Sequence, residues 1–134
     1  MNGLFVDTAG WMACADGRDP VHKKACDARD RWLGKGGILI TSDYIMDESL
    51  TLIRQRLGLQ AAEIWWQMLE GSSFLQWELV GPERAEKARH LFFRFKDKDF
   101  SFTDCTSFII MQELKLRNVL SSDKHFHQMG FCLH

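Results

Sequence analysis

The sequence predicts an α/β fold in which helices cover both faces of a parallel β-sheet. Short apolar runs alternate along the chain with longer segments of helical periodicity. Glycines mark the breaks between these segments. The 134 residues contain two prolines and no repeat or linker, so we expect residues 1–134 to form a single domain.

Five apolar runs predict the strands. Each is short, and their alternation with helical segments is typical of a parallel sheet covered on both faces. The expected strands are residues 3–6, 38–41, 74–80, 118–121 and 131–133.

Helical periodicity fills the stretches between the strands. Ser42 or Asp43 opens one helix, and Ser101-Phe102-Thr103-Asp104 fits a capping box that opens another. A helix between consecutive strands is the usual crossover of a parallel sheet. The expected helices lie near residues 21–34, 42–57, 59–70, 83–95 and 102–116.

Composition limits the classes of protein and the cellular compartments that fit the sequence. The formal net charge of −1 does not by itself mark a nucleic-acid binder. The four cysteines form no C-x-x-C pair, which favours reduced thiols in the cytoplasm over a disulfide framework. No apolar run reaches the ~18 residues of a membrane span, so we expect no membrane association. One alternative is a zinc site near the C-terminus, formed by His125, His127, Cys132 and His134.

Two acidic residues follow expected strands. Asp7 comes directly after the first strand, and Asp123 comes shortly after the fourth. Sites in open α/β sheets form at the carboxyl ends of strands, where the strand order reverses, so these carboxylates meet there if the two strands are neighbours. The alternative is that Asp7 caps a helix and Asp123 begins a turn.

Two further acidic residues lie on expected helices. Glu48 flanks the inward stripe of its helix, and it either faces the site or reaches solvent. Asp104 shares a stripe with Phe108 and Met111 in a segment that is apolar on nearly every side. A buried carboxylate needs a cation or hydrogen-bond donors, and the capping box is the alternative use of Asp104.

Together the four acids would repel one another unless a cation neutralised them. Mg²⁺ prefers oxygen ligands and commonly keeps waters beside one or two carboxylates. Such an ion can activate water and stabilise the charge that develops during phosphodiester cleavage. The pattern therefore predicts a divalent metal site for phosphoryl chemistry.

At these positions the sequence resembles PIN-domain proteins, and within them the VapC-like toxins of bacterial toxin–antitoxin pairs. The four matching stretches occur in the family's order and span essentially the whole chain. They are Phe5-Val6-Asp7-Thr8, residues 41–52 (TSDYIMDESLTL), residues 97–108 (DKDFSFTDCTSF) and residues 120–126 (LSSDKHF).

The resemblance implies a PIN-like three-layer sandwich with a five-stranded parallel sheet in the order 3-2-1-4-5. It also implies an Mg²⁺- or Mn²⁺-dependent endoribonuclease that cleaves structured RNA such as tRNA, forms a homodimer and is inhibited by a small cognate antitoxin. The acidic quartet carries over as Asp7, Glu48, Asp104 and Asp123. Asp7 and Asp104 would be metal ligands, Glu48 would orient a water, and Asp123 would complete the site. Thr8, Thr103 and Ser107 would assist from beside the acids, and Asp99 would be structural.

Other acidic-pocket folds fit less well. A receiver-type signalling domain would place an aspartate after the third strand, where Glu78-Leu79-Val80-Gly81 stands. A phosphatase of the haloacid-dehalogenase type would show D-x-D after the first strand, but Thr8 and Ala9 follow Asp7. A PIN-fold module that binds or processes RNA without a toxin role remains the alternative.

Two further features of the sequence bear on partners and substrate. The segment Leu59–Glu70 contains Ile64, Trp65, Trp66, Met68 and Leu69, an apolar arc wide enough for a dimer or partner surface. Basic residues that could contact phosphate are Arg54, Arg56, Lys124 and those of the loop at residues 94–99.

Overall fold

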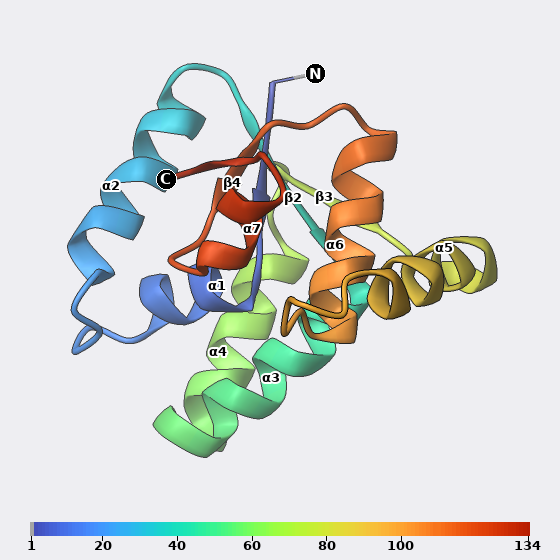
Figure 1. The fold of residues 1–134 in the computed structure, drawn as a ribbon. Coiled ribbons are helices and arrows are strands. Elements are labelled where there is room, and N and C mark those ends of the chain that lie inside the picture. Colours follow the sequence, from blue (N-terminus) through green and yellow to red (C-terminus); the bar gives the residue numbers. More distant parts are fainter. Residues whose placement is uncertain (1) are drawn as a thin grey trace.

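The computed structural model describes residues 2–134 and contains five parallel strands in the order β3-β2-β1-β4-β5. This confirms the predicted fold class and strand order. The strands are β1 (Gly3–Val6), β2 (Ile38–Ser42), β3 (Leu75–Glu78), β4 (Asn118–Leu120) and β5 (Cys132–Leu133). The helices described are α1 (Thr8–Ala15), α2 (His22–Gly34), α3 (Asp43–Leu57), α4 (Leu59–Glu70), α5 (Gly81–Arg94), α6 (Phe102–Glu113) and α7 (Lys124–Gln128) (Figure 1).

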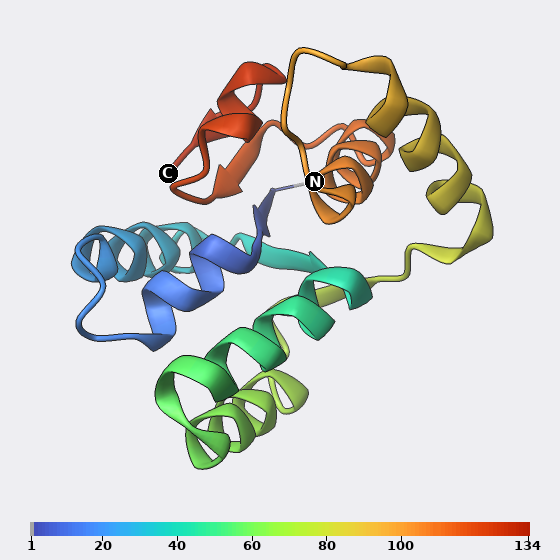
Figure 2. The same ribbon diagram turned by 60° about the horizontal axis from the view of Figure 1, so that its bottom comes forward.

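The molecule has three layers. Figure 2 shows α1 to α4 on one side of the sheet and α5 to α7 on the other. The central strand β1 is buried along its whole length and pairs with β2 on one side and β4 on the other. Because the chain leaves β1 toward β2 and later returns to β4, the reversal of strand order lies between β1 and β4.

Helix α1 lies unusually close to β4. A Cβ atom added at Gly10 would lie 2.1 Å from the carbonyl oxygen of Leu120, so only glycine permits this approach. The contact fixes the first turn of α1 against the end of β4. Both elements therefore have defined positions where β1 ends.

Two helices are additional to those expected from the sequence, and some element boundaries differ. Helix α1 (TAGWMACA) is apolar on all sides and therefore lacks the periodicity that predicts an amphipathic helix. Helix α7 has only five residues. Helix α5 begins at Gly81, two residues before the expected start, because Pro82 fits the first turn of a helix. Strand β3 ends at Glu78 and α6 at Glu113, both earlier than expected.

The cysteines are free, as predicted, across the described residues. No helix between residues 2 and 134 combines the length and apolar character that crossing a bilayer requires.

Candidate active site

The register of the sheet brings Asp7 next to Ser121. Val6 pairs with Leu120 at the carboxyl ends of β1 and β4, so the next residue of each strand emerges at the same edge. The Ser121 hydroxyl donates a 2.6 Å hydrogen bond to Oδ2 of Asp7. The same hydroxyl accepts a 2.9 Å hydrogen bond from the backbone N–H of Asp123. Ser121 therefore connects two of the four predicted acids.

Asp7 is a buried carboxyl group with two protein donors. Its Oδ1 accepts from the backbone N–H of Gly10 at 2.9 Å, which caps α1, and its Oδ2 accepts from Ser121. Burial raises the pKa of Asp7 from 3.8 to about 7; the hydrogen bonds from Ser121 and Gly10 oppose the rise, and the charges of Asp123 and Asp104 add to it. A nearby cation would stabilise the charged form of this buried carboxylate.

Asp104 and Asp123 also begin helices. Asp104 completes a capping box with Ser101, and Asp123 accepts from the backbone N–H of His125. The capping alternatives considered for Asp7 and Asp104 are therefore correct, and Asp123 caps α7 where a turn was considered. All three acids nevertheless line one cleft. Burial raises the pKa of Asp104, and the charge of Asp123 adds to that rise. Helix capping engages one oxygen of Asp104 and one of Asp123, which leaves the other for a further ligand.

His125 lies between these acids. Its Nδ1 is 3.0 Å from Oδ1 of Asp123 and 3.3 Å from Oδ2 of Asp104, although neither contact has hydrogen-bond geometry. Its Nε2 is 2.9 Å from Oδ1 of Asp99, an exposed residue that orients the ring. Burial lowers the pKa of His125, but Asp99, Asp123 and Asp104 outweigh it and leave the pKa raised. His125 is thus the nearest counter-charge to the acids, and the sequence analysis assigned it no such role.

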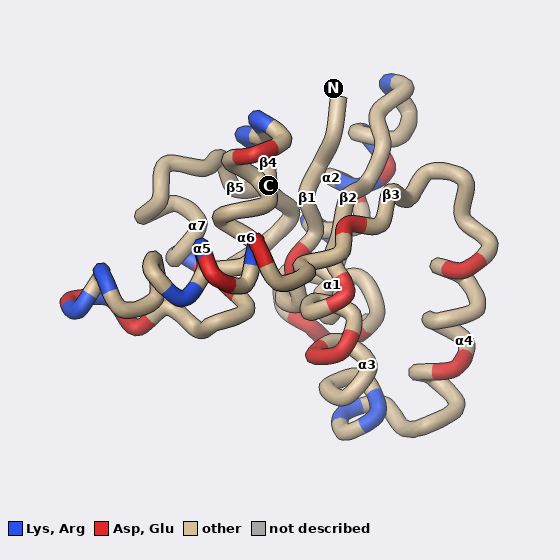
Figure 3. The backbone as a smooth tube through the Cα atoms, turned by 90° about the vertical axis from the view of Figure 1, so that its right-hand side faces the viewer, with Lys and Arg blue, Asp and Glu red and all other residues tan. Residues whose placement is uncertain are grey.

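Glu48 reaches the same cleft from α3. The cleft has a volume of about 320 Å³, several times that of one water, and Asp7, Glu48, Asp104 and Asp123 all line it. Glu48 is exposed and does not belong to the closest group of candidate ligands, which among residues 2–134 is Asp104, Asp123 and His125. Figure 3 shows acidic positions around α1 and the start of α3, and basic positions at the end of α3.

One hydroxyl that is buried without a protein partner among residues 2–134, that of Thr8, lines the cleft and is available to a metal-bound water. Between residues 2 and 134, the hydroxyls of Thr8, Ser49 and Ser107 are buried without a hydrogen-bond partner. Thr8 also lines the cleft, beside Asp7. The free carboxylate oxygens and the Thr8 hydroxyl are oxygen donors that fit Mg²⁺ or Mn²⁺, and the ring nitrogen of His125 lies beside them. Of the three expected assisting donors, Thr8 lines the cleft, whereas Thr103 and Ser107 do not.

The candidate phosphate-binding and zinc-binding residues lie in different parts of the structure. Arg56 lines the cleft, whereas Lys124 is exposed at the start of α7. The C-terminal zinc alternative is not supported, because His134 instead bonds Asn118 at 2.9 Å and packs against Trp32.

Comparison with known proteins gives the family. The chain is 30% identical over 128 residues to the 23S rRNA-specific endonuclease VapC20 of Mycobacterium tuberculosis, covering 96% of this chain and 95% of the relative. The chain belongs to the VapC family. The resemblance noted in the sequence is thereby confirmed, and with it the class of activity: this family consists of ribonucleases of the toxin–antitoxin type.

A solved structure and a second relative agree. The crystal structure of Mycobacterium tuberculosis VapC20, described as a sarcin–ricin loop cleaving toxin, superposes with a TM-score of 0.87 at 29% identity, covering 96% of each chain. A VapC ribonuclease of Archaeoglobus fulgidus is 35% identical over 94 residues, covering 69% of this chain and 58% of the relative. No family model matches the chain.

Proposed function

We propose that this VapC-family endoribonuclease depends on Mg²⁺ or Mn²⁺ and cleaves structured RNA at the cleft formed by Asp7, Glu48, Asp104 and Asp123. The convergence of three carboxylates at the carboxyl ends of β1 and β4, with Asp7 buried, is the observation that carries the proposal. We further propose that residues 1–134 act as a single nuclease domain in the cytoplasm. One continuous sheet and one connected core support the domain assignment.

Each acid has a role that follows from its position. Asp7, Asp104 and Asp123 would hold the metal, and Ser121 would keep Asp7 oriented. Glu48, exposed on the wall of the cleft, would orient the attacking water and accept its proton. Arg56, on the same wall, would bind substrate phosphate. A bound metal would lower the pKa of the water that it holds and would stabilise the negative charge that develops on the phosphate.

The substrate proposal follows the relatives. Because a relative with 30% identity is named a 23S rRNA-specific endonuclease, and the superposed structure a sarcin–ricin loop cleaving toxin, we propose that loop as the first RNA to test, with tRNA as the second. The test incubates purified protein with rRNA and tRNA in Mg²⁺, Mn²⁺ or excess EDTA. Cleavage should require metal.

Variants locate the chemistry in this test. Asp7→Asn and Asp104→Asn should abolish cleavage, whereas Asp97→Asn, which changes an exposed aspartate outside the cleft, should cleave like the unmodified protein. If Asp7→Asn or Asp104→Asn cleaves at the unmodified rate, the site assignment is wrong.

We also propose a homodimer and a small cognate antitoxin. Helix α4 exposes Leu59, Ile64 and Met68, each by more than half, and Phe74 is exposed just before β3. Trp65 instead packs into the core, which leaves a narrower exposed arc than the sequence suggested. Size-exclusion chromatography with light scattering should give twice the monomer mass, and expression should slow growth unless the antitoxin is co-expressed. A monomer at high concentration that is harmless on expression would contradict both.

A further inference from the structure

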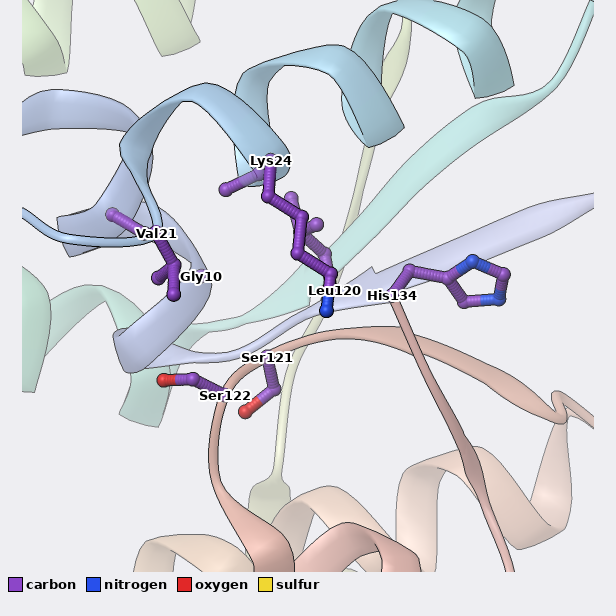
Figure 4. A pocket seen from close by; sticks show the side chains of 9 residues that line it. Gly10, Val21, Lys24, Leu120, Ser121, Ser122 and His134 are labelled. Carbon is purple, nitrogen blue, oxygen red and sulfur yellow. The ribbon is translucent and has the colours of Figure 1, made fainter.

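A row of hollows leads away from the acidic cleft along α2. Ser122 lines both the cleft and a pocket of about 40 Å³, which Lys24 and His134 also line. Figure 4 shows the side chain of Lys24 pointing from α2 into this pocket, with Ser121 and Ser122 across from it. His134 in turn borders a second hollow of about 200 Å³, lined by Arg31, Trp32 and Lys35. The first hollow therefore adjoins the cleft at Ser122, and the second adjoins the first at His134.

The charges along this row have one sign. Lys24, Arg31 and Lys35 have no carboxylate within 4.0 Å among residues 2–134, whereas Lys23 pairs with Asp27 and Arg29 with Asp30 elsewhere on the same helix. No acidic residue lines either hollow. The three cations are exposed, which leaves their charges available to a ligand.

The spacing of the three cations places them in a line along one face of the helix. Residues 24, 28, 31 and 35 follow the three- and four-residue steps of one helix face, with the buried Ala28 between the cations. Lys35 directly follows the last residue of α2, so eleven helical steps separate Lys24 from Lys35, a distance of about 16 Å. A single anion cannot span that length, but an extended polyanion can.

An aromatic pair lies beside the line. Trp32 and His134 pack edge to face with centroids 5.6 Å apart, and both are partly exposed in the second hollow. Burial lowers the pKa of His134, and the nearby charges of Arg31 and Lys24 lower it further. A cationic groove with an aromatic side chain is the combination that binds single-stranded nucleic acid through phosphates and stacked bases.

We infer that Lys24, Arg31 and Lys35 form a binding track for the RNA backbone, which runs from the acidic cleft along α2 and ends at Trp32. The inference rests on the proposed function, because the track guides the strand that the cleft cuts. The continuity through Ser122 favours RNA over an acidic peptide: a strand whose phosphate lies in the cleft reaches Lys24 next. The hollow formed by Asp47, Glu48, Thr51, Leu52, Gln55 and Thr103 has two acidic residues and no basic residue in its lining. The hollow formed by Glu86, Arg89, His90 and Phe93 shares no lining residue with the cleft.

The test compares two variants that each lose two positive charges. Lys24→Gln/Arg31→Gln removes charge from the track, and Lys23→Gln/Lys115→Gln removes the same charge from exposed positions outside it. All proteins also carry Asp104→Asn, so that RNA stays uncut while fluorescence anisotropy follows binding of a labelled 20-nucleotide single-stranded RNA of mixed sequence. Each phosphate contact contributes about 0.7 to the slope of log affinity against log salt.

Loss of two contacts should therefore reduce the salt slope by about 1.4 and weaken binding about 25-fold at 0.1 M salt. The control should bind within about two-fold of the reference. Lys24→Arg/Arg31→Lys should restore binding, and Lys35→Gln alone should reduce the slope by about 0.7. Because all these side chains are exposed, thermal melts should match that of the reference.

If both double variants lost the same RNA affinity, the loss would reflect the net charge of the protein and not a local track, which would overturn the inference. Unchanged affinity and slope in Lys24→Gln/Arg31→Gln would also overturn it. A double variant that binds RNA normally but escapes antitoxin inhibition would make this face a protein-binding surface instead. If the unmodified chain neither cuts nor binds RNA, the proposed function itself fails, whereas cutting without dependence on Lys24 and Arg31 rejects only the track.

Discussion

The hydroxyl of Ser121 donates to the carboxylate of Asp7 and accepts from the backbone N–H of Asp123. Ser121 is 114 positions from Asp7 in the sequence, and it holds the acid after β1 and the acid after β4 in one arrangement. The hydrogen bond to Asp7 lowers a pKa that burial raises. It therefore favours the charged form that a metal requires.

Ser121→Ala should weaken metal binding. Without the hydroxyl, Oδ2 of Asp7 loses its donor, and loss of a residue that orients a ligand typically costs 10–100-fold in metal affinity or activity. The metal concentration at half-maximal cleavage should rise by about that factor, and Ser73→Ala, on an exposed turn, should leave it unchanged. An identical metal titration for Ser121→Ala would show that this hydrogen bond does not tune the site.

The metal-free protein should lose stability as pH rises from about 4 to 7. The pKa of Asp7 is raised from 3.8 to about 7 in the folded state, so its contribution to the free energy of unfolding is complete below pH 4 and is lost as pH rises through 7. The raised pKa of Asp104 acts in the same direction. A shift of this size corresponds to roughly 4 kcal/mol for Asp7.

Urea unfolding in EDTA across this pH range measures the effect, and Asp7→Asn is the control that should flatten most of the slope. Mg²⁺ should restore stability at pH 7, because a ligand that binds only the folded state stabilises it. A free energy of unfolding that is independent of pH in EDTA and indifferent to Mg²⁺ would contradict the buried acidic site.

Gly10→Ala should destabilise the fold, since the new Cβ would lie 2.1 Å from the carbonyl oxygen of Leu120. Overpacking of this kind typically costs about 1–3 kcal/mol, and here it would also displace Asp7, whose Oδ1 bonds the Gly10 N–H. Gly17→Ala is the matched control, because no atom lies within 4 Å of its Cβ. Equal thermal stabilities of the two variants would show that the α1–β4 contact is not a constraint.

The sequence predicted the sheet well because its strands are short apolar runs separated by helices. Strand order came from the family resemblance, and it is what turns Asp7 and Asp123 from separate helix caps into neighbours. Helix α1 could not be predicted from periodicity, because burial on nearly all sides removes the polar face that creates the signal.

Side-chain partners were harder to foresee. Ser121 lies in a matched stretch, but its role depends on the β1–β4 register, which couples residues far apart in the sequence. His125 was considered for zinc, whereas the structure places it against Asp104 and Asp123. Lys24 and Arg31 gave no signal of their own, since only the positions of Ser122 and His134 show which face of α2 borders the pocket beside the cleft.

Anomalous diffraction from crystals grown with Mn²⁺ tests the central claim most directly. The account predicts a manganese peak in the cleft, in contact with carboxylate oxygens of Asp7 and Asp104 and close to Asp123, and the loss of that peak in Asp104→Asn. The account would be contradicted if protein that cleaves RNA gave crystals with manganese peaks elsewhere and none in the cleft.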